Sequence, residues 1–538
     1  MATLEVYNNP VPHLHNLNDP SLEFAYDSEE DHDAGISPNL STYTSVRQSL
    51  DIQPQAPTGA PVTQERTAHD SEKEEGAGLA DPNVIFWDGP EDPENPMNWS
   101  NSFKWGNLVV ILYMVFVTRL ASTMLAPGVP EVMAKLHETS SLLAPFVVSV
   151  FFLGEAFGLL VLLPLSQIYG RRWIYIISNI LFIIFTIACG VSSNFHMLIG
   201  FRFLQGSAGS ASVTLAHGTI TDLMPLKKRV SVQVIFGLLY GAGLFLGPVT
   251  GGFLIQAKGW QWVFYLTASS TGFIPILGFF LLSETFAPVL LERRAAKLRV
   301  DTGNLDLHSP STILPNEVFR LSIVRPIRLL LTSPIVLFMS LYVALASGIF
   351  CLLLSTMTFV LKERYHFSTG IVGLTYIGVG VGRIVGQFFI GVFSAYLPNK
   401  AEGKLLKLEH YISITLTVLG GFWMPIGLFM YGWGTEKVIH WIVPLIGTAF
   451  VAAGLWHNYK TAVKYIIRAV KIEDNTSATT AIIVLRPVID AILPLAGLVI
   501  YDKLGLGWGN SLLGFIALAL ILIPVIFKVY GERTNSKY

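Results

Sequence analysis

The sequence contains few cysteines and little charge. Only 2 of the 538 residues are cysteines, and both, Cys189 and Cys351, stand inside apolar runs, which excludes a disulfide framework and a paired-cysteine metal cluster. Charged residues make up 14% of the chain, against ~25% in an average soluble protein. The N-terminal segment lacks both a basic flank and an apolar stretch, so we expect no cleaved secretory signal. Collagen and a chain disordered throughout are also excluded.

Several catalytic and nucleotide-binding motifs are missing as well. The sequence has no G-x-x-x-x-G-K-[ST] phosphate loop, no H-E-x-x-H and no nucleophile elbow. Direct use of ATP is therefore not indicated, and a membrane-embedded enzyme would lack visible chemistry. We expect no metal and no cofactor. The basic residues are dispersed between apolar runs and form no single patch, so a nucleic-acid partner is not expected either.

The acidic and basic residues are distributed unevenly along the chain. The formal net charge is −1, yet the first 102 residues hold 19 acids against only three bases, Arg47, Arg66 and Lys73. A segment so rich in Asp, Glu, Ser, Pro and Thr cannot bury enough apolar surface to offset its ordering entropy. We predict an acidic, disordered tail over 1–102. A regulatory role and a merely solvated extension are the alternatives for it.

From Phe103 onward the sequence is a succession of apolar stretches, each near the ~20 residues that a helix needs to cross a bilayer. About twelve spans are predicted, at 103–126, 142–163, 173–191, 196–217, 231–256, 261–283, 333–359, 369–393, 410–431, 438–459, 478–500 and 507–529. They predict an all-α membrane protein with two six-helix bundles (103–283 and 333–530), a polar linker (284–332) and a short C-terminal tail (531–538). Transporters built from repeats typically have this arrangement.

Lysine and arginine set the predicted orientation, because cytosolic connections carry the excess of these residues. With the N-terminus in the cytosol, the inner side holds 23 basic residues and the outer side 6. We therefore predict that both termini are cytosolic, and we expect a plasma-membrane location. The Asn-x-Ser/Thr sites at Asn39, Asn98 and Asn475 then lie on the inner side and should carry no glycan.

The fifth predicted span contains a run of spaced glycines. Gly243, Gly247 and Gly251 stand one helical turn apart and leave a groove without side chains, Pro248 adds a kink, and Gly252 follows. The run resembles the antiporter motif of the drug:proton antiporter branch of the major facilitator superfamily, in its fungal twelve-helix exporter type. The resemblance implies a role in gating, with simple close packing of membrane helices as the alternative.

The short loop after the second span also resembles a motif of that superfamily. Gly170, Arg171 and Arg172 match the loop that latches the inner gate by pairing basic residues with acids and helix ends. The sequence departs from the motif at Gln167, where the family has an acid, and at Leu163, where it usually has Gly. These departures imply a weaker charge latch.

Further phrases of the fungal antiporter type, among them Asn95-Pro-Met-Asn-Trp99 and Glu284-Thr-Phe-Ala-Pro288, extend the resemblance to about residues 92–530. Arg202 and Gln205 match the helix 4 motif R-x-x-Q-G, which the family associates with proton coupling. An arginine at mid-depth costs at least ~2.5 kcal/mol, so Arg202 should face the bundle interior with a partner. A second glycine ridge in the eighth span should face the fifth across the two bundles; it consists of Gly378, Gly382 and Gly386.

Charged side chains within the spans are candidates for proton exchange. Arg486 and Asp490 stand four residues apart and pair along one helix face, a structural account that competes with a functional one. At ~1.5 Å per residue, Glu155 and Arg486 lie at similar depth, and helices 2 and 11 pack together in the superfamily fold, so we expect them to meet. Either Glu155 or Asp490 is predicted to carry the proton, since a carboxyl group shielded from water can have a raised pKa. Arg119 and Arg383 also lie within spans, and we assign them no role in proton exchange.

The function implied is export of a small organic molecule driven by proton entry, by a chain that we expect to act as a monomer in the lipid bilayer. The family's central cavity is lined by helices 1, 4, 7 and 10, and the candidate substrate contacts there are Phe350, Met357, Phe359, Trp456 and His457. An uptake symporter or facilitator of the same superfamily is the first alternative. A polytopic enzyme or receptor is the second. The sequence leaves open whether drugs, toxins or secondary metabolites are exported.

Overall fold

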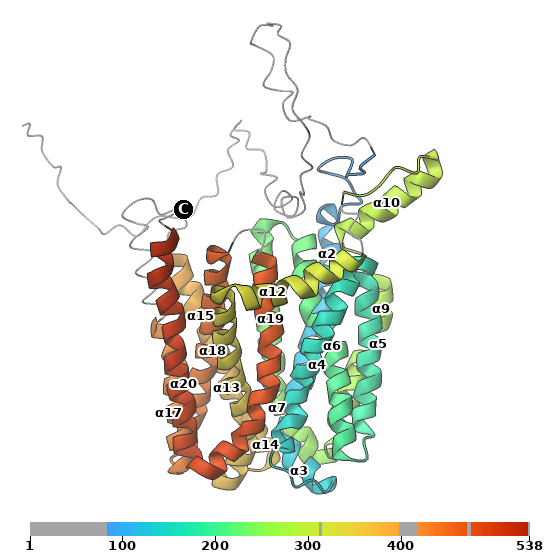
Figure 1. Ribbon diagram of the computed structural model, residues 1–538. Coiled ribbons are helices and arrows are strands. Elements are labelled where there is room, and N and C mark those ends of the chain that lie inside the picture. The colour runs from blue at the N-terminus through green and yellow to red at the C-terminus, as the bar shows by residue number, and fades with distance from the viewer. Residues whose placement is uncertain (1–82, 311–314, 397–417, 471–474, 536–538) are drawn as a thin grey trace, which may run out of the picture. The chain divides into compact units, whose positions relative to one another are not determined.

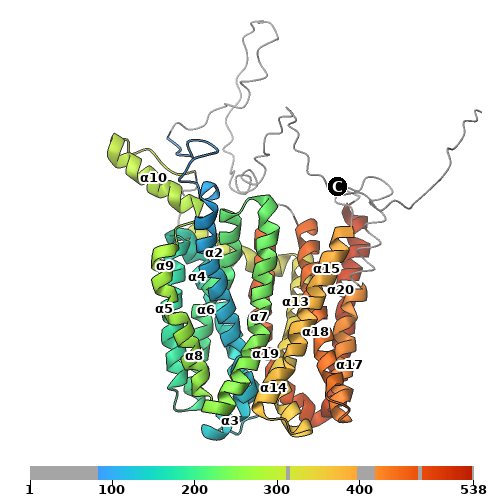
Figure 2. The ribbon, with the colours of Figure 1, turned by 180° about the vertical axis from the view of Figure 1, so that it is seen from behind.

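A computed structural model describes residues 83–310, 315–396, 418–470 and 475–535, and the predicted tail up to residue 82 lies outside them. The first bundle consists of α2 (Asn101–Thr123), α3 (Val129–Lys135), α4 (Leu143–Tyr169), α5 (Arg171–Gly190), α6 (Phe195–Leu223), α7 (Leu226–Lys258), α8 (Gln261–Gly272) and α9 (Ile274–Leu281). The second consists of α13 (Pro334–Tyr365), α14 (Thr369–Thr375), α15 (Ile377–Tyr396), α17 (Trp423–Glu436), α18 (Ile442–Ala469), α19 (Asn475–Ile492) and α20 (Gly497–Asn535). Figures 1 and 2 show these helices running roughly parallel in two groups.

The helices follow the apolar runs of the sequence. Within the described residues, eight helical stretches are long and apolar enough to cross a membrane. They cover nine of the predicted spans, because one stretch, Ser477–Phe527, holds two of them. The other three predicted spans correspond to α6 and α18, which carry more polar residues, and to α17, whose span begins outside the described residues.

The two spans within the last stretch are separated by a sharp turn. Gly505 has φ +77°, a left-handed conformation in which a side chain would be strained, and the helix axis changes direction there. Glu436 stabilises the new helix start, because its Oε2 accepts hydrogen bonds from the N–H groups of Leu506 (2.9 Å) and Gly507 (3.3 Å). The predicted boundary between 478–500 and 507–529 falls at this turn.

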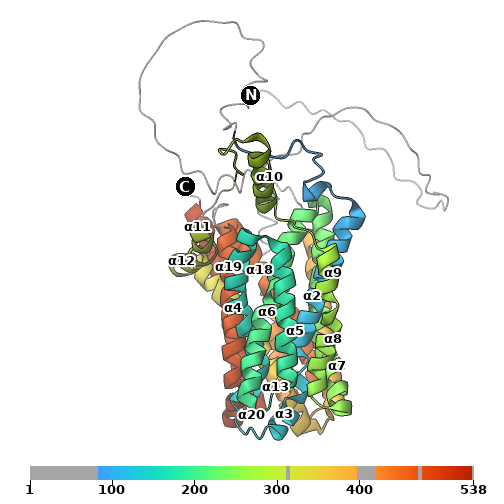
Figure 3. The same ribbon diagram turned by 90° about the vertical axis from the view of Figure 1, so that its right-hand side faces the viewer.

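Short helices connect the two bundles. The linker contains α10 (Ala287–Thr302), α11 (Pro315–Phe319) and α12 (Arg325–Thr332), with a π-helical turn, η3 (Arg320–Val324), before α12. Figures 1 and 3 show α10 and α12 at one end of the bundles and α3 at the other. We refer to these as the α10 end and the far end.

Residues 83–102, which the composition assigns to the disordered tail, have a defined structure. Asp92 is buried, and its carboxylate accepts hydrogen bonds from Asp88 N (2.9 Å) and Glu94 N (2.8 Å) and pairs with Arg294 Nη1 of α10 (2.6 Å). The bond with Asp88 N, the Arg294 pair and the bond with Glu94 N lower the pKa of Asp92 from its usual 3.8. The predicted boundary at 102 is therefore too late, because local composition does not reveal an ion pair with a residue 202 positions away.

The apolar core is organised differently at the two ends. One cluster of buried residues draws on both bundles at the far end, where Val129 and Val132 of the first bundle join Leu352 and Val372 of the second. At the α10 end the first bundle has its own cluster, which includes Leu108, Leu215 and Phe236. The second bundle has another, which includes Val336, Tyr342 and Ala462. The bundles therefore share apolar packing at the far end and pack separately at the α10 end.

Candidate functional site

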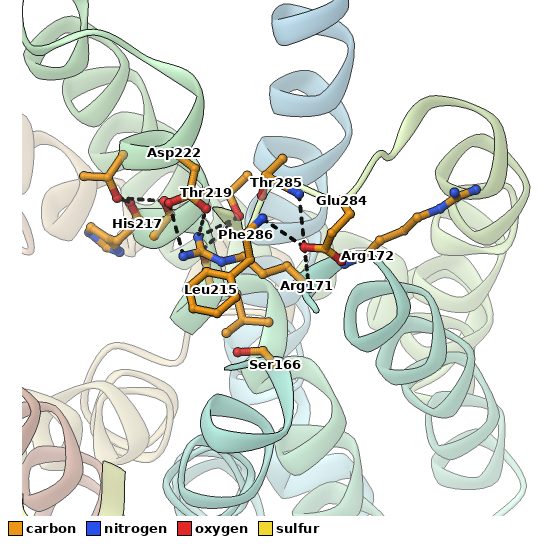
Figure 4. A network of polar contacts seen from close by, with 12 residues as sticks. Ser166, Arg171, Arg172, Leu215, His217, Thr219, Asp222, Glu284, Thr285 and Phe286 are labelled. Carbon is orange, nitrogen blue, oxygen red and sulfur yellow. Dashed lines mark hydrogen bonds and ion pairs between the residues drawn. The ribbon is translucent and has the colours of Figure 1, made fainter. Parts of the chain in front are cut away.

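The predicted latch loop turns sharply between α4 and α5 (Figure 4). Gly170 has φ +90°, and a Cβ there would overlap the Glu284 carboxylate. Glu284 follows the end of α9, and its oxygens accept hydrogen bonds from Arg171 N (2.9 Å) and Arg172 N (3.2 Å) at the start of α5. It also accepts from Thr285 N and Phe286 N, both at 3.0 Å. One buried carboxylate thus satisfies the first N–H groups of α5 and joins α9 to the latch loop.

The Arg171 side chain points from this loop to the end of α6. Its Nη1 lies 3.0 Å from Asp222 Oδ2 and 3.3 Å from Thr219 Oγ1, and its guanidinium carbon lies 5.2 Å from the Phe286 ring centroid. Gly218 leaves room for this arrangement, since a Cβ there would overlap the guanidinium group. The sequence motif thus brings a charge pair together at the α10 end.

The other latch residues make different contacts. Arg172 donates to the carbonyl oxygen of Phe279 in α9 at 2.7 Å. Gln167, at the position where the family motif has an acid, accepts a hydrogen bond from Ser322 Oγ of the linker at 3.2 Å. The contacts described for Arg171 and Arg172 lie within the first bundle and the residues that directly follow α9. Gln167 contacts the linker instead.

The glycine run of the fifth span packs mainly inside its own bundle. A Cβ at Gly243, Gly247 or Gly251 would overlap backbone atoms of α2 or of the residue that follows it. Gly252 alone of this set faces the second bundle, where a Cβ would lie 2.6 Å from Thr369 O. The run lets α7 approach α2 closely, and its end reaches α14.

The expectation that two glycine ridges meet between the bundles is wrong. Gly378, Gly382 and Gly386 face α18, where a Cβ at each would crowd Leu445, Ala449 and Ala453 respectively. The close approach of the bundles in this region comes from other residues, since Gly373 packs against Pro248 O and Gly380 against the Phe245 ring. Glycine spacing identifies a smooth helix face, but it does not identify the helix that the face meets.

Arg202 and Gln205 are both fully buried in the first bundle. The Arg202 guanidinium donates to Ser122 O (2.8 Å), Ala121 O (3.0 Å) and Gln205 Oε1 (3.0 Å). Its charge is therefore held by carbonyl oxygens, and Gln205 is its side-chain partner. The prediction that Arg202 has a partner in the bundle interior is met. Arg202 joins the ends of α2 and α6 toward the far end.

Glu155 does not pair with Arg486, contrary to our expectation. Its carboxylate forms an ion pair with Arg119 of α2, which is 1% exposed. Arg486 instead donates to Ser347 Oγ (2.9 Å) and lies 3.5 Å from Asp490 Oδ2. The Arg486–Asp490 pairing is as predicted, and α4 does contact α19, where Ser149 Oγ donates to Ala491 O at 3.0 Å. The rise per residue thus gives the depth of Glu155 and Arg486 correctly, but it does not give the rotation of α4 and α19 about their own axes.

A continuous series of cationic and aromatic side chains crosses the interface between the bundles. Tyr240 of α7 lies 4.4 Å from the guanidinium carbon of Arg119 and 5.0 Å from that of Arg383 in α15. Arg383 in turn lies 4.3 Å from the Trp456 ring centroid, and Trp456 stacks on Tyr459, at a centroid distance of 6.0 Å. Arg486 lies 5.9 Å from the Tyr459 ring, which completes a series that we call the cation–aromatic chain.

Only Trp456 of the five predicted cavity residues belongs to this chain. Phe350 and Met357 are buried in the far-end core, and Phe359 packs against it. His457 is 7% exposed and its Nε2 lies 3.4 Å from Thr461 Oγ1. Tyr240 and Tyr459 were missed. The sequence places Arg383 within a span without indicating a role for it. A charged residue at membrane depth is itself a signal that marks Arg383 as a candidate for the site.

Polar contacts join the bundles at the far end. Glu131 of α3 accepts hydrogen bonds from Lys362 Nζ of α13, at 2.5 Å, and from Thr369 Oγ1 of α14. Nearby, Gln256 Oε1 accepts from Gly370 N at 2.9 Å, and Thr358 Oγ1 donates to Ala126 O at 2.9 Å. Together with the shared core, these contacts hold the two bundles together at that end. We call the Glu131–Lys362–Thr369 contact the far-end latch.

Comparison with known proteins identifies a family model that matches the chain and several proteins of similar sequence. The family model described as Major Facilitator Superfamily matches residues 111–463. The chain is 44% identical over 460 residues to "Efflux pump radE" of Floropilus chiversii, covering 85% of each chain. It is 40% identical over 530 residues to "MFS-type transporter atr4" of Stereocaulon alpinum, covering 96% of this chain and 95% of that one.

Solved structures agree on the fold. A partially occluded, inward-open structure of the xylose transporter XylE from E. coli matches with a TM-score of 0.58 and 16% identity, over 79% of this chain and 98% of that one. A D-xylose–proton symporter matches with a TM-score of 0.59 and 15% identity, over 78% and 97%. At such identities the likeness concerns the fold alone.

Proposed function

Because the chain belongs to the major facilitator superfamily, we propose that it exports small organic molecules in exchange for protons, by alternating access between its two bundles. Membership makes it a multi-pass membrane transporter of small molecules and not an enzyme. The word "efflux" in the name of one relative supports the outward direction. The cargo class is a drug, a toxin or a secondary metabolite.

The observation that supports alternating access best is the asymmetry of the two ends. The bundles share one apolar core and several hydrogen bonds at the far end, and have separate cores at the α10 end. If the basic α10 end is cytosolic, as the distribution of lysine and arginine predicts, this is the state that loads cargo from the cytosol. Both termini are then cytosolic. We also propose a plasma-membrane location and a monomeric transporter.

We assign proton exchange to the two carboxylates, Glu155 and Asp490, that pair with arginines of the cation–aromatic chain. Glu155 contacts Arg119 of another helix, and Asp490 contacts Arg486 one turn away, so each proton gained would release an arginine. Arg202, which binds the carbonyl oxygens of Ala121 and Ser122 and is oriented by Gln205, would couple this event to the far end. Arg171, Arg172 and the glycine run would govern the gate.

Purified protein in vesicles tests this proposal. Under an imposed pH gradient, wild-type protein should move a substrate out of the compartment that faces the α10 end, and Glu155→Gln or Asp490→Asn should abolish the pH-driven part. Glu363→Gln is the matched control, because Glu363 is exposed at the end of α13. Full activity in both variants would remove these carboxylates as carriers. Proton-driven accumulation in the opposite direction would indicate an uptake symporter.

A further inference from the structure

Arg383 is distinguished from the other arginines of the cation–aromatic chain by its lack of an acidic partner. Among the described residues it has no ion pair and no hydrogen bond, and its Nε is buried without an acceptor. Its contacts are the rings of Tyr240 and Trp456 and the backbone near Gly241. An aromatic ring attracts a guanidinium group through its π face, but it supplies no lone pair to the N–H donors. The charge of Arg383 is therefore left uncompensated.

The neighbouring arginines are neutralised by acids. Glu155 pairs with Arg119, and Asp490 pairs with Arg486. Lys460, which is exposed, lies 5.0 Å from the Trp456 ring and supplies no negative charge to Arg383. Among the described residues of this part of the interface, the three arginines Arg119, Arg383 and Arg486 thus face two acids. A buried ionic group usually has a partner, since leaving it unpaired in a medium of low dielectric is costly.

The residues around Arg383 indicate what kind of molecule could pair with its charge. Arg383 and Trp456 belong to the second bundle and Tyr240 to the first, so an anion held there would contact both halves of the transporter. A guanidinium group binds a carboxylate through two parallel N–H···O bonds in its own plane. The neighbouring rings offer apolar surface for the rest of the molecule.

We infer that the transported molecule is an organic anion, namely a carboxylate joined to an aromatic or otherwise apolar body, and that Arg383 binds its acidic group while Trp456 and Tyr240 contact its body. This inference rests on the proposed transport function and adds the substrate class. It also explains why an arginine without an acid is tolerated between the bundles. The bound substrate itself supplies the missing negative charge.

Calorimetry on the full chain in detergent tests the inference with three probes of one shape: naphthaleneacetic acid, naphthaleneethanol and naphthylethylamine. Wild-type protein should bind the acid at least ~10-fold more tightly than the alcohol or the amine, the factor expected for a charge-assisted pair. Arg383→Gln should remove this preference. Arg383→Lys, which keeps the charge but not the fork, should retain part of it. Arg328→Gln is the matched control on the exposed surface of α12 and should change nothing.

The outcomes separate the inference from the proposed function. Equal binding of the three probes by wild-type protein would overturn the organic-anion inference, and this result does not depend on any variant folding. An acid preference that survives in well-folded Arg383→Gln protein would overturn the assignment of Arg383. Transport of the amine or alcohol under a pH gradient, without binding of the acid, would support proton-coupled export and contradict the inference that the substrate is an organic anion. Binding of the acid without pH-driven movement would support the anion and contradict proton coupling.

Discussion

Replacing Glu131 with Gln should open the far end of the transporter. The far-end latch joins the bundles through an ion pair whose side chains are 39% and 22% exposed, and through a second bond from Thr369. At that exposure the pair contributes only ~0.5–1 kcal/mol. The charge-assisted bond from the hydroxyl adds ~1 kcal/mol. A loss of ~1.5–2 kcal/mol shifts the equilibrium between the two states by ~10–30-fold.

Cysteine labelling measures this shift. Cys189 and Cys351 are both buried, so a cysteine introduced at Val129 in the far-end core is the intended target of a membrane-impermeant maleimide. Its labelling rate should rise ~10–30-fold in the Glu131→Gln background, in proportion to the open population. Glu363→Gln serves as the matched control and should leave the rate unchanged. An unaltered rate in folded Glu131→Gln protein would refute the latch.

Three further predictions concern packing and helix ends. Gly251→Leu should prevent folding or sharply reduce the yield of intact protein in gel filtration, because its side chain would overlap the Met124 carbonyl. Glu284→Gln should lower the free energy of unfolding by ~1–3 kcal/mol in a denaturant titration, since an amide leaves some of the N–H groups of Arg171, Arg172, Thr285 and Phe286 without an acceptor; unchanged stability would contradict the capping role. Asp92→Asn should speed proteolysis between residues 83 and 98. In wild-type protein, the stabilisation of this segment by Asp92 should be complete above pH ~4 and should be lost as the pH falls through the lowered pKa of Asp92. Hydrogen exchange of the segment's amides, corrected for intrinsic rates, would detect this loss.

The sequence is sufficient to predict the membrane-spanning helices and the pairing of some charged groups. Apolar runs of bilayer length predict most of the spans, because a helix is the arrangement in which a single segment of ~20 apolar residues satisfies its own N–H and C=O groups in lipid. The family resemblance implies an acid for Arg171, and the cost of burying a charge implies a partner for Arg202. Asp222 and Gln205 are the partners found. The linker helices and the ordered segment 83–102 were not predicted, because their contacts join distant parts of the chain.

The rotation of each helix about its axis is what the sequence does not reveal. Rise per residue gives the depth of Glu155 and Arg486, but membrane helices are apolar on several faces, so periodicity does not show which face meets which neighbour. For this reason Glu155 was assigned the wrong partner, and the two glycine ridges were expected to meet. The capping role of Glu284 was missed because the N–H groups that it binds at Arg171 and Arg172 are 113 and 112 residues away.

The most direct test of the account is a pair of interbundle distances measured by spin labels in vesicles, with and without a pH gradient and substrate. Exposed Lys228 and Lys464 report on the α10 end, and exposed Lys135 and Lys437 on the far end. Alternating access predicts that the first distance shortens while the second lengthens when transport is driven. Two distances that stay constant, or that change in the same direction, while substrate is still transported would contradict it.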